Sequence, residues 1–189
     1  MEYERTLVLV KPEGMKRHLV GEIIKRFERT GLKLVGAKMV QADEELISKH
    51  YPESMAEAIW AKAKEIMEKE GKTFTHTVES YGMARVRELR KHLVETPVMA
   101  IVLEGPSAIR CVRKLAGFTS ADRADLGTIR GDLSCDSFEL GNALKRPVRN
   151  IVHSSDAESA EKEIKLWFKA SELFDWESAV QNAAYSAIE

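Results

Sequence analysis

Four apolar stretches along the chain predict the strands of a sheet. They lie at residues 6–10, 32–40, 97–103 and 151–152. Residues 98–103 are almost continuously apolar, which is typical of a strand buried on both faces, whereas alternation would indicate one exposed face. Neither LVLV nor VMAIVL contains an aromatic residue, so these strands offer no platform on which nucleic-acid bases would stack.

The segments between these strands show apolar residues at helical spacing. Capping and stop signals divide them into helices over 20–29, over 54–71 with a capping box of Ser54 and Glu57, over 83–94, from Pro106, and from an N-cap at Asp156. The order is strand, helix, strand, helices, strand, helices, strand, helix. This order predicts an α+β fold of the ferredoxin-like, split βαβ type, in which helices cover one face of a four-stranded antiparallel sheet.

Composition narrows the function classes. A chain of 189 residues with 44% hydrophobic and 31% charged residues can bury a core, and we expect one domain over 1–189. A formal net charge of -1 gives no general basic field for nucleic acid or membranes. Cys111 and Cys135 match no metal or disulfide pattern. With no basic leader and no long apolar run, the expected location is the cytoplasm.

The strongest chemical signal is the stretch NIVHSSD, residues 150–156. It places His153 where a strand gives way to a helix. Free backbone N–H groups and the helix dipole favour an anion at such a point. The stretch therefore predicts a phosphate beside an imidazole, although a lone histidine at a strand end is more often an ordinary surface residue.

Glu163 is unusual because it falls within the apolar stripe of the last helix, formed by Ala160, Ile164 and Trp167. An inward carboxylate needs a partner, and it can hold an imidazole in one tautomer. Two interpretations remain open from the sequence. Glu163 either orients His153 or extends to solvent at the edge of the stripe.

Further phosphate ligands are expected at strand or helix ends. The candidates are Lys11, Arg113, Thr119 and Arg130. Each alone is more often a surface residue, but together with NIVHSSD they predict a phosphate site.

Seven parts of the chain resemble the nucleoside diphosphate kinase family: TLVLVKPEG, LVGEIIKRFERTGLKLVGAKM, the pair His50 and Tyr51, PVMAIVLEG, VRKLAGFT, GTIRGD and NIVHSSD. They occur in the family's order. Insertions at about 52–90 and 133–149, with the stretch KRPVRN, resemble a longer form found in archaeal members.

The resemblance implies a ping-pong transfer of the terminal phosphate from a nucleoside triphosphate to a nucleoside diphosphate through phospho-His153. Mg²⁺ would arrive on the nucleotide phosphates rather than in a protein metal site. The implied roles are as follows: Lys11, Arg130 and Tyr51 contact the transferring phosphoryl group, Arg113 and Thr119 hold the next phosphate, Asn150 binds the ribose 3′-hydroxyl, and Ser155 with Glu163 orients His153.

The chain departs from the family pattern at several positions. Ser154 stands where glycine is usual, Leu126 stands where proline is common, and the spacing from Asp156 to Glu163 is about one residue short. By spacing, the family's position for an aromatic residue that stacks on the base falls near Arg85 or Val86, neither of which is aromatic, so no stacking residue is assigned. The matching motifs contain no group that reads a base edge, so weak discrimination between bases is expected. A homo-hexamer is expected, with a tetramer as the alternative.

Two other function classes compete with this interpretation. A ferredoxin-like regulatory domain could bind a nucleotide without catalysis and would not need His153. A nucleic-acid-binding sheet would need exposed aromatics and a basic face, which the apolar strands and the net charge disfavour.

Overall fold

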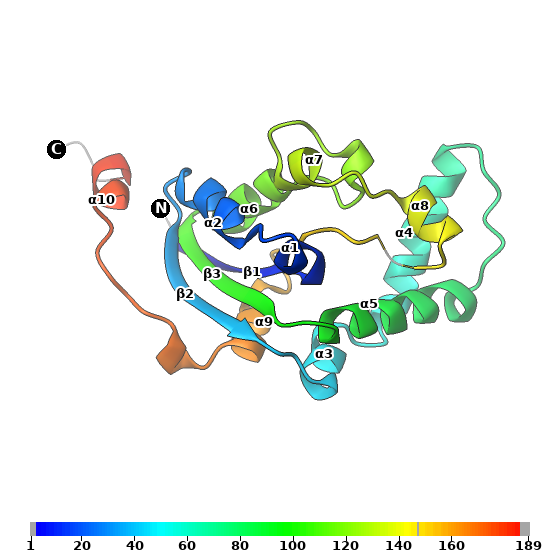
Figure 1. The fold of residues 1–189 in the computed structure, drawn as a ribbon, viewed down its shortest axis with the longest axis horizontal. Coiled ribbons are helices and arrows are strands. Elements are labelled where there is room, and N and C mark those ends of the chain that lie inside the picture. The colour runs from blue at the N-terminus through cyan, green and yellow to red at the C-terminus, as the bar shows by residue number, and fades with distance from the viewer. Residues whose placement is uncertain (1–2, 147, 186–189) are drawn as a thin grey trace.

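The computed structural model describes residues 3–146 and 148–185 and contains one four-stranded sheet in the order β2-β3-β1-β4. The strands are β1 (Tyr3–Val10), β2 (Lys33–Val40), β3 (Val98–Pro106) and β4 (Val152–Ser154), and each neighbouring pair is antiparallel. Together with the helices that pack on it, this sheet confirms the predicted α+β, ferredoxin-like class (Figure 1).

Helices pack on both faces of the sheet, so the expectation that they cover one face is wrong. The first face carries α1 (Pro12–Lys16), α2 (Val20–Glu28), α6 (Ala108–Ala116) and α7 (Ile129–Leu133). The opposite face carries α3 (Glu44–His50), α5 (Ala84–Val94) and α9 (Ala160–Trp167). The reason lies in β1, where Leu7 and Leu9 face one core and Val8 and Val10 face the other. All four are fully buried, and only helices on both faces can bury them.

A group of helices extends beyond one end of the sheet (Figure 1). It contains α4 (Met55–Lys69), the π-helix η1 (Val78–Met83), most of α5, and α8 (Phe138–Ala143). The remaining short helices are η2 (Ala121–Arg123), η3 (Ala170–Glu172) and α10 (Ala179–Tyr185). Among all the helices described, none has the length and apolar character needed to cross a membrane.

Three local predictions are wrong. Asp156 is not the N-cap of α9, because the chain turns after β4 and the N-cap is Ser159. The side chain of Ser54 does not cap α4, and the capping box is instead formed by Thr77 and Ser80 at the start of η1. Pro106 ends β3 instead of starting a helix, because Ser107 adopts a left-handed conformation at φ 51° and α6 begins after it. A reversal of this kind between a strand and a helix is not encoded in apolar spacing.

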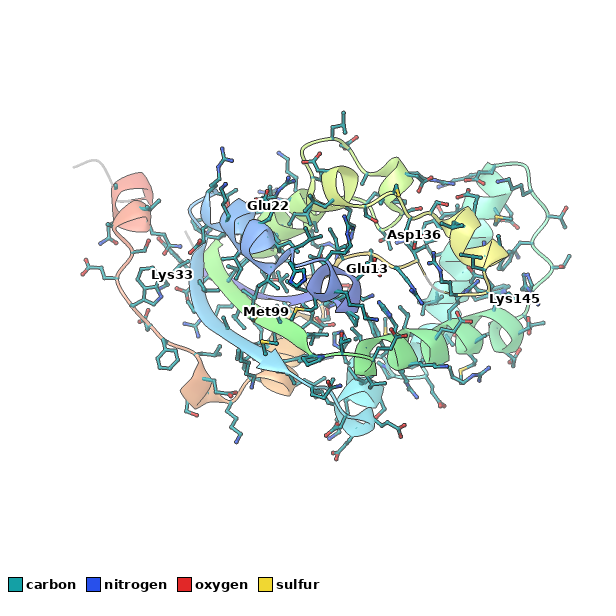
Figure 2. All side chains as sticks on the ribbon, viewed as in Figure 1. Glu13, Glu22, Lys33, Met99, Asp136 and Lys145 are labelled. Atoms are coloured by element: carbon teal, nitrogen blue, oxygen red, sulfur yellow. The ribbon has the colours of Figure 1, made fainter. Side chains whose placement is uncertain are left out.

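The chain after α9 runs along the edge of β2, which the sequence did not reveal. The Phe174 N–H donates to the Val35 carbonyl at 2.8 Å, and the Trp176 indole donates to the Leu34 carbonyl at 2.9 Å. Lys33, labelled in Figure 2, forms an ion pair with Asp175 at 3.0 Å. These contacts satisfy backbone groups that an edge strand would otherwise leave free.

Gly82 is the tightest point of the packing between α4 and η1. A Cβ atom there would lie 2.2 Å from the Ala56 carbonyl oxygen, whereas a Cβ at Gly21, in α2, would meet nothing within 4 Å. We expect Gly82→Ala to lower the free energy of unfolding by about 1–3 kcal/mol through overpacking. Gly21→Ala should leave it unchanged or raise it by up to about 1 kcal/mol. Urea unfolding followed by circular dichroism measures both, and equal midpoints would contradict this packing.

Candidate active site

His153 is positioned by the short strand β4. It pairs with Leu9 of β1. Ser155 continues the pairing, since its N–H donates to the Leu7 carbonyl at 3.1 Å. Asp156 then accepts a hydrogen bond from the Ser159 N–H at 3.0 Å, in the turn that leads into α9. The His153 side chain is 19% exposed at this junction, so the ring reaches the surface while its backbone is held in the sheet.

Glu163 points inward from the first turn of α9 and contacts His153. The distance from His153 Nε2 to Glu163 Oε2 is 2.8 Å, and the Ser155 hydroxyl donates to the same carboxylate oxygen. The Glu163 side chain is only 13% exposed. Of the two interpretations left open by the sequence, the geometry therefore agrees with a partner of His153, and the shortened spacing after Asp156 does not turn Glu163 away.

This contact decides which ring nitrogen of His153 carries the free lone pair. A carboxylate accepts hydrogen bonds, so Nε2 carries the proton and the lone pair is on Nδ1. Burial alone would raise the pKa of Glu163, but the hydrogen bond and charge of His153 outweigh burial and hold the pKa below its ordinary value. The carboxylate is consequently ionised near neutral pH, as a partner of an N–H group should be.

His50, which sequence reasoning did not single out for a role, lies against His153. The two ring centroids are 4.7 Å apart and edge-on, and the buried His50 Nδ1 accepts a hydrogen bond from the Trp167 indole at 3.3 Å. Burial and the nearby His153 charge lower the pKa of His50 to about 3, so the ring is neutral. Only its position next to Tyr51 in the sequence could have indicated this role.

His50, His153 and Glu163 also offer ligand atoms within 4.8 Å of one another, a spacing that a metal ion could use. However, His153 Nε2 and Glu163 Oε2 are hydrogen-bonded at 2.8 Å, and a metal between them would break this bond. We therefore assign the group to hydrogen bonding.

Two cations are buried beside His153. Lys11 follows β1 and is 2% exposed, and its pKa is lowered to about 7 by burial and by the charge of Arg130. Arg130 is 7% exposed and donates to the carbonyls of Gly117 and Val152. Burial and the charge of Arg113 lower the pKa of Arg130 to about 10. An anion would relieve this mutual repulsion, so the arrangement favours phosphate.

Nearly all the predicted site residues line one cleft of about 880 Å³. They are Lys11, Tyr51, Arg113, Thr119, Arg130, Asn150, His153 and Glu163. Ser155 is the exception, because it lies fully buried behind His153, where it reaches Glu163. Burial and the Glu163 charge raise the pKa of Tyr51, which keeps its phenol protonated as a donor. Asn150 Oδ1 is buried and has no hydrogen-bond partner in the described part of the chain.

Comparisons with known proteins agree with this geometry. The family model described as nucleoside diphosphate kinase matches residues 4–91 and 72–173. A nucleoside diphosphate kinase of Pyrococcus abyssi is 42% identical, over 94% of this chain and 92% of its own. Human nucleoside diphosphate kinase 3 is 38% identical, over 97% of this chain and 88% of its own.

Solved structures give the same result. An NDP kinase from Pyrobaculum aerophilum has a TM-score of 0.84 and 39% identity, covering 92% of this chain and 100% of its own. A transition-state mimic of the Borrelia burgdorferi nucleoside-diphosphate kinase, with bound vanadate and ADP, has a TM-score of 0.80 and 34% identity, covering 98% of both chains.

Fold, site and relatives define the class of protein as a phosphotransferase that acts on nucleotides. Within that class, the chain belongs to the nucleoside diphosphate kinase family. The similarity to archaeal members agrees with the predicted resemblance. The comparisons give no support to a regulatory domain without catalysis.

The Glu163 contact predicts a graded loss of rate. Glu163→Gln keeps an acceptor for the Nε2–H but removes the charge that stabilises it, so we expect phosphorylation of His153 to slow by roughly 10-fold or more. The matched control is Glu161→Gln, on the same helix, where the side chain is 82% exposed and paired with Lys165. Rapid-mixing kinetics measures both rates. Equal rates for the two variants would contradict the assignment.

The lowered pKa of Lys11 predicts a pH dependence of nucleotide binding. In the free protein, the Lys11 side chain loses its proton, and with it its charge, as the pH rises through about 7. A bound phosphate favours the charged form, so binding takes up a proton above that pH and the affinity falls by up to about tenfold per pH unit. Calorimetry with MgADP between pH 7.5 and 9 should show this slope, and Lys11→Met should flatten it. The same slope in both proteins would contradict it.

Proposed function

We propose that this enzyme transfers the terminal phosphate of a nucleoside triphosphate to a nucleoside diphosphate by a ping-pong mechanism through phospho-His153. The observation that carries the proposal is the 2.8 Å contact between His153 Nε2 and Glu163, in a cleft that also contains Lys11 and Arg130. A domain that only binds nucleotide would have no need of an oriented imidazole. Histidine suits the reaction because, with an ordinary pKa of about 6.5, a neutral nucleophilic form is available near pH 7.

The reaction consists of one phosphoryl-transfer step and its reverse. The Nδ1 lone pair of His153 forms a bond to the terminal phosphorus, while the bond from phosphorus to the bridging oxygen breaks and its electron pair leaves with the nucleoside diphosphate. Nε2 keeps its proton, and Glu163 stabilises the positive charge that develops on the ring. In the second half, a terminal oxygen of the acceptor diphosphate attacks the phosphorus and the electron pair of the P–N bond returns to Nδ1.

The buried cations act on the charge of the transferring group. Its equatorial oxygens carry most of the charge in a loose transition state, and fixed donors in a desolvated site stabilise that charge. Lys11, Arg130 and the Tyr51 hydroxyl take this role. Arg113 and Thr119 hold the next phosphate at the more open side of the cleft.

The sugar and the metal complete the substrate. The unpartnered Oδ1 of Asn150 supports a contact with the ribose 3′-hydroxyl, because a buried acceptor needs a donor. Mg²⁺ belongs to the magnesium–nucleotide substrate, since the side chains assigned to phosphate are cations and neutral donors, which suit phosphate oxygens better than a metal.

We also propose the organisation of the chain. Residues 1–189 form one domain with insertions at about 52–90 and 133–149, and ion pairs from Arg123 to Glu70 and Glu139 support their packing together. A homo-hexamer, or alternatively a tetramer, is supported by exposed apolar side chains such as Leu126, which is 88% exposed. The cytoplasm is the proposed compartment, and membranes and nucleic acids are not proposed partners.

Covalent labelling tests the function. Incubation with γ-labelled ATP should give protein-bound label that is stable in base and lost in acid, and subsequent GDP should remove it as GTP. His153→Ala should abolish the label, whereas His76→Ala, an exposed histidine outside the cleft, should retain it. Label on serine, or an active His153→Ala protein, would overturn the mechanism.

A further inference from the structure

A second cavity, of about 250 Å³, opens from the cleft on the side of Thr119 and Asn150. These two residues line both spaces, together with Lys62 and Leu89. Thr119 and Asn150 are the groups to which the proposed function assigns a phosphate and the ribose. In a nucleotide held by these two groups, the base therefore extends from the ribose into this cavity.

The cavity is built between α4, α5 and α8, the group of helices beyond the end of the sheet (Figure 1). Its walls are largely apolar, with Ile59 and Ile66 from α4, Leu89 from α5, and Val148 from the segment before β4. Figure 2 labels Asp136 and Lys145, which lie just before and just after α8 in the chain. An apolar slot that continues from a sugar-binding residue suits the flat ring of a nucleobase.

One part of the lining is polar and rigid. Arg85 Nη2 donates to Asn142 Oδ1 at 2.8 Å, and the Tyr81 hydroxyl donates to the same oxygen at 3.4 Å. Arg85 also pairs with Glu88 at 2.7 Å, lies 4.9 Å from the centre of the Tyr81 ring, and is only 13% exposed. The guanidinium is thus fixed from several sides, which preorganises both Arg85 and Asn142 for a ligand.

The side chains in this part of the lining offer a ligand hydrogen-bond donors rather than acceptors. Asn142 Oδ1 already accepts two bonds, so the amide offers its N–H groups to a ligand. The other charged side chains that line the cavity, Lys62 and Arg146, are also donors, and none of the described residues lining it is acidic. This part of the cavity therefore favours a base edge rich in acceptors and disfavours an exocyclic amine on that same edge, since the amine would need an acceptor there.

We infer that Arg85 and Asn142 read the O6 and N7 atoms of guanine and make this enzyme prefer guanine over adenine nucleotides. Guanine presents two acceptors on this edge, whereas adenine replaces O6 with an amino group. This inference rests on the proposed function, since the cleft must hold the phosphates and the ribose. It adds base-reading groups that the sequence motifs lack, from two segments separated by 57 positions in the chain.

Equilibrium binding provides the test, because it does not depend on catalysis. Calorimetry should give a dissociation constant for MgGDP that is about tenfold or more below that for MgADP. Inosine diphosphate, which keeps O6 and N7 but lacks the 2-amino group, should bind like GDP. Arg85→Ala and the isosteric Asn142→Asp should each bring the GDP and ADP constants within about threefold of each other.

Arg87→Ala is the matched control, since Arg87 is exposed on the same helix and should leave the preference intact. Acid-labile labelling of each variant by ATP is measured in parallel. If the unmodified protein takes up label but binds GDP and ADP equally well, the inference is overturned and the proposed function stands. If it prefers GDP but takes up no label, the proposed function is overturned and the base preference stands. A preference that survives both substitutions, or inosine diphosphate that binds like ADP, also overturns the inference.

Discussion

The hydrogen bond between His153 Nε2 and Glu163 is the interaction on which the rest of the site depends. It joins β4 to α9, two elements that are adjacent in the chain but meet only because Ser155 and Asp156 end the strand and turn the backbone. The ionised carboxylate fixes the imidazole tautomer, and the tautomer decides which ring nitrogen carries the free lone pair. Ser155, buried behind the ring, keeps the carboxylate in place.

Desolvation is the second constraint. Lys11 and Arg130 end at the same side of the sheet, and burial lowers the pKa of both side chains. The charge of Arg130 lowers the pKa of Lys11 further, and the charge of Arg113 does the same to Arg130. Like charges close together in a desolvated site favour the binding of an anion. The folded scaffold supplies the compensating energy, because the consecutive apolar residues of β1 and β3 are buried on both faces.

The helices beyond the sheet set the limits of the substrate site. Arg85 comes from α5 and Asn142 from α8, and their contact closes a cavity that continues from the phosphate cleft. The ion pairs of Arg123 with Glu70 and Glu139 connect the end of α4 with α8. Chemistry is thus placed on the rigid sheet, and selection of the base is placed on more peripheral helices.

The sequence by itself predicted the strands, most helices and most of the residues that meet in the cleft, since apolar spacing, caps and the NIVHSSD stretch are local signals. It also placed Glu163 on the inner stripe of its helix. Only the tertiary structure decided that both sheet faces are covered, that His50 packs on His153, that the C-terminal segment follows β2, and that Arg85 meets Asn142. The physical reason is that local periodicity fixes which side of an element is buried, whereas contacts between distant segments depend on how whole elements pack together.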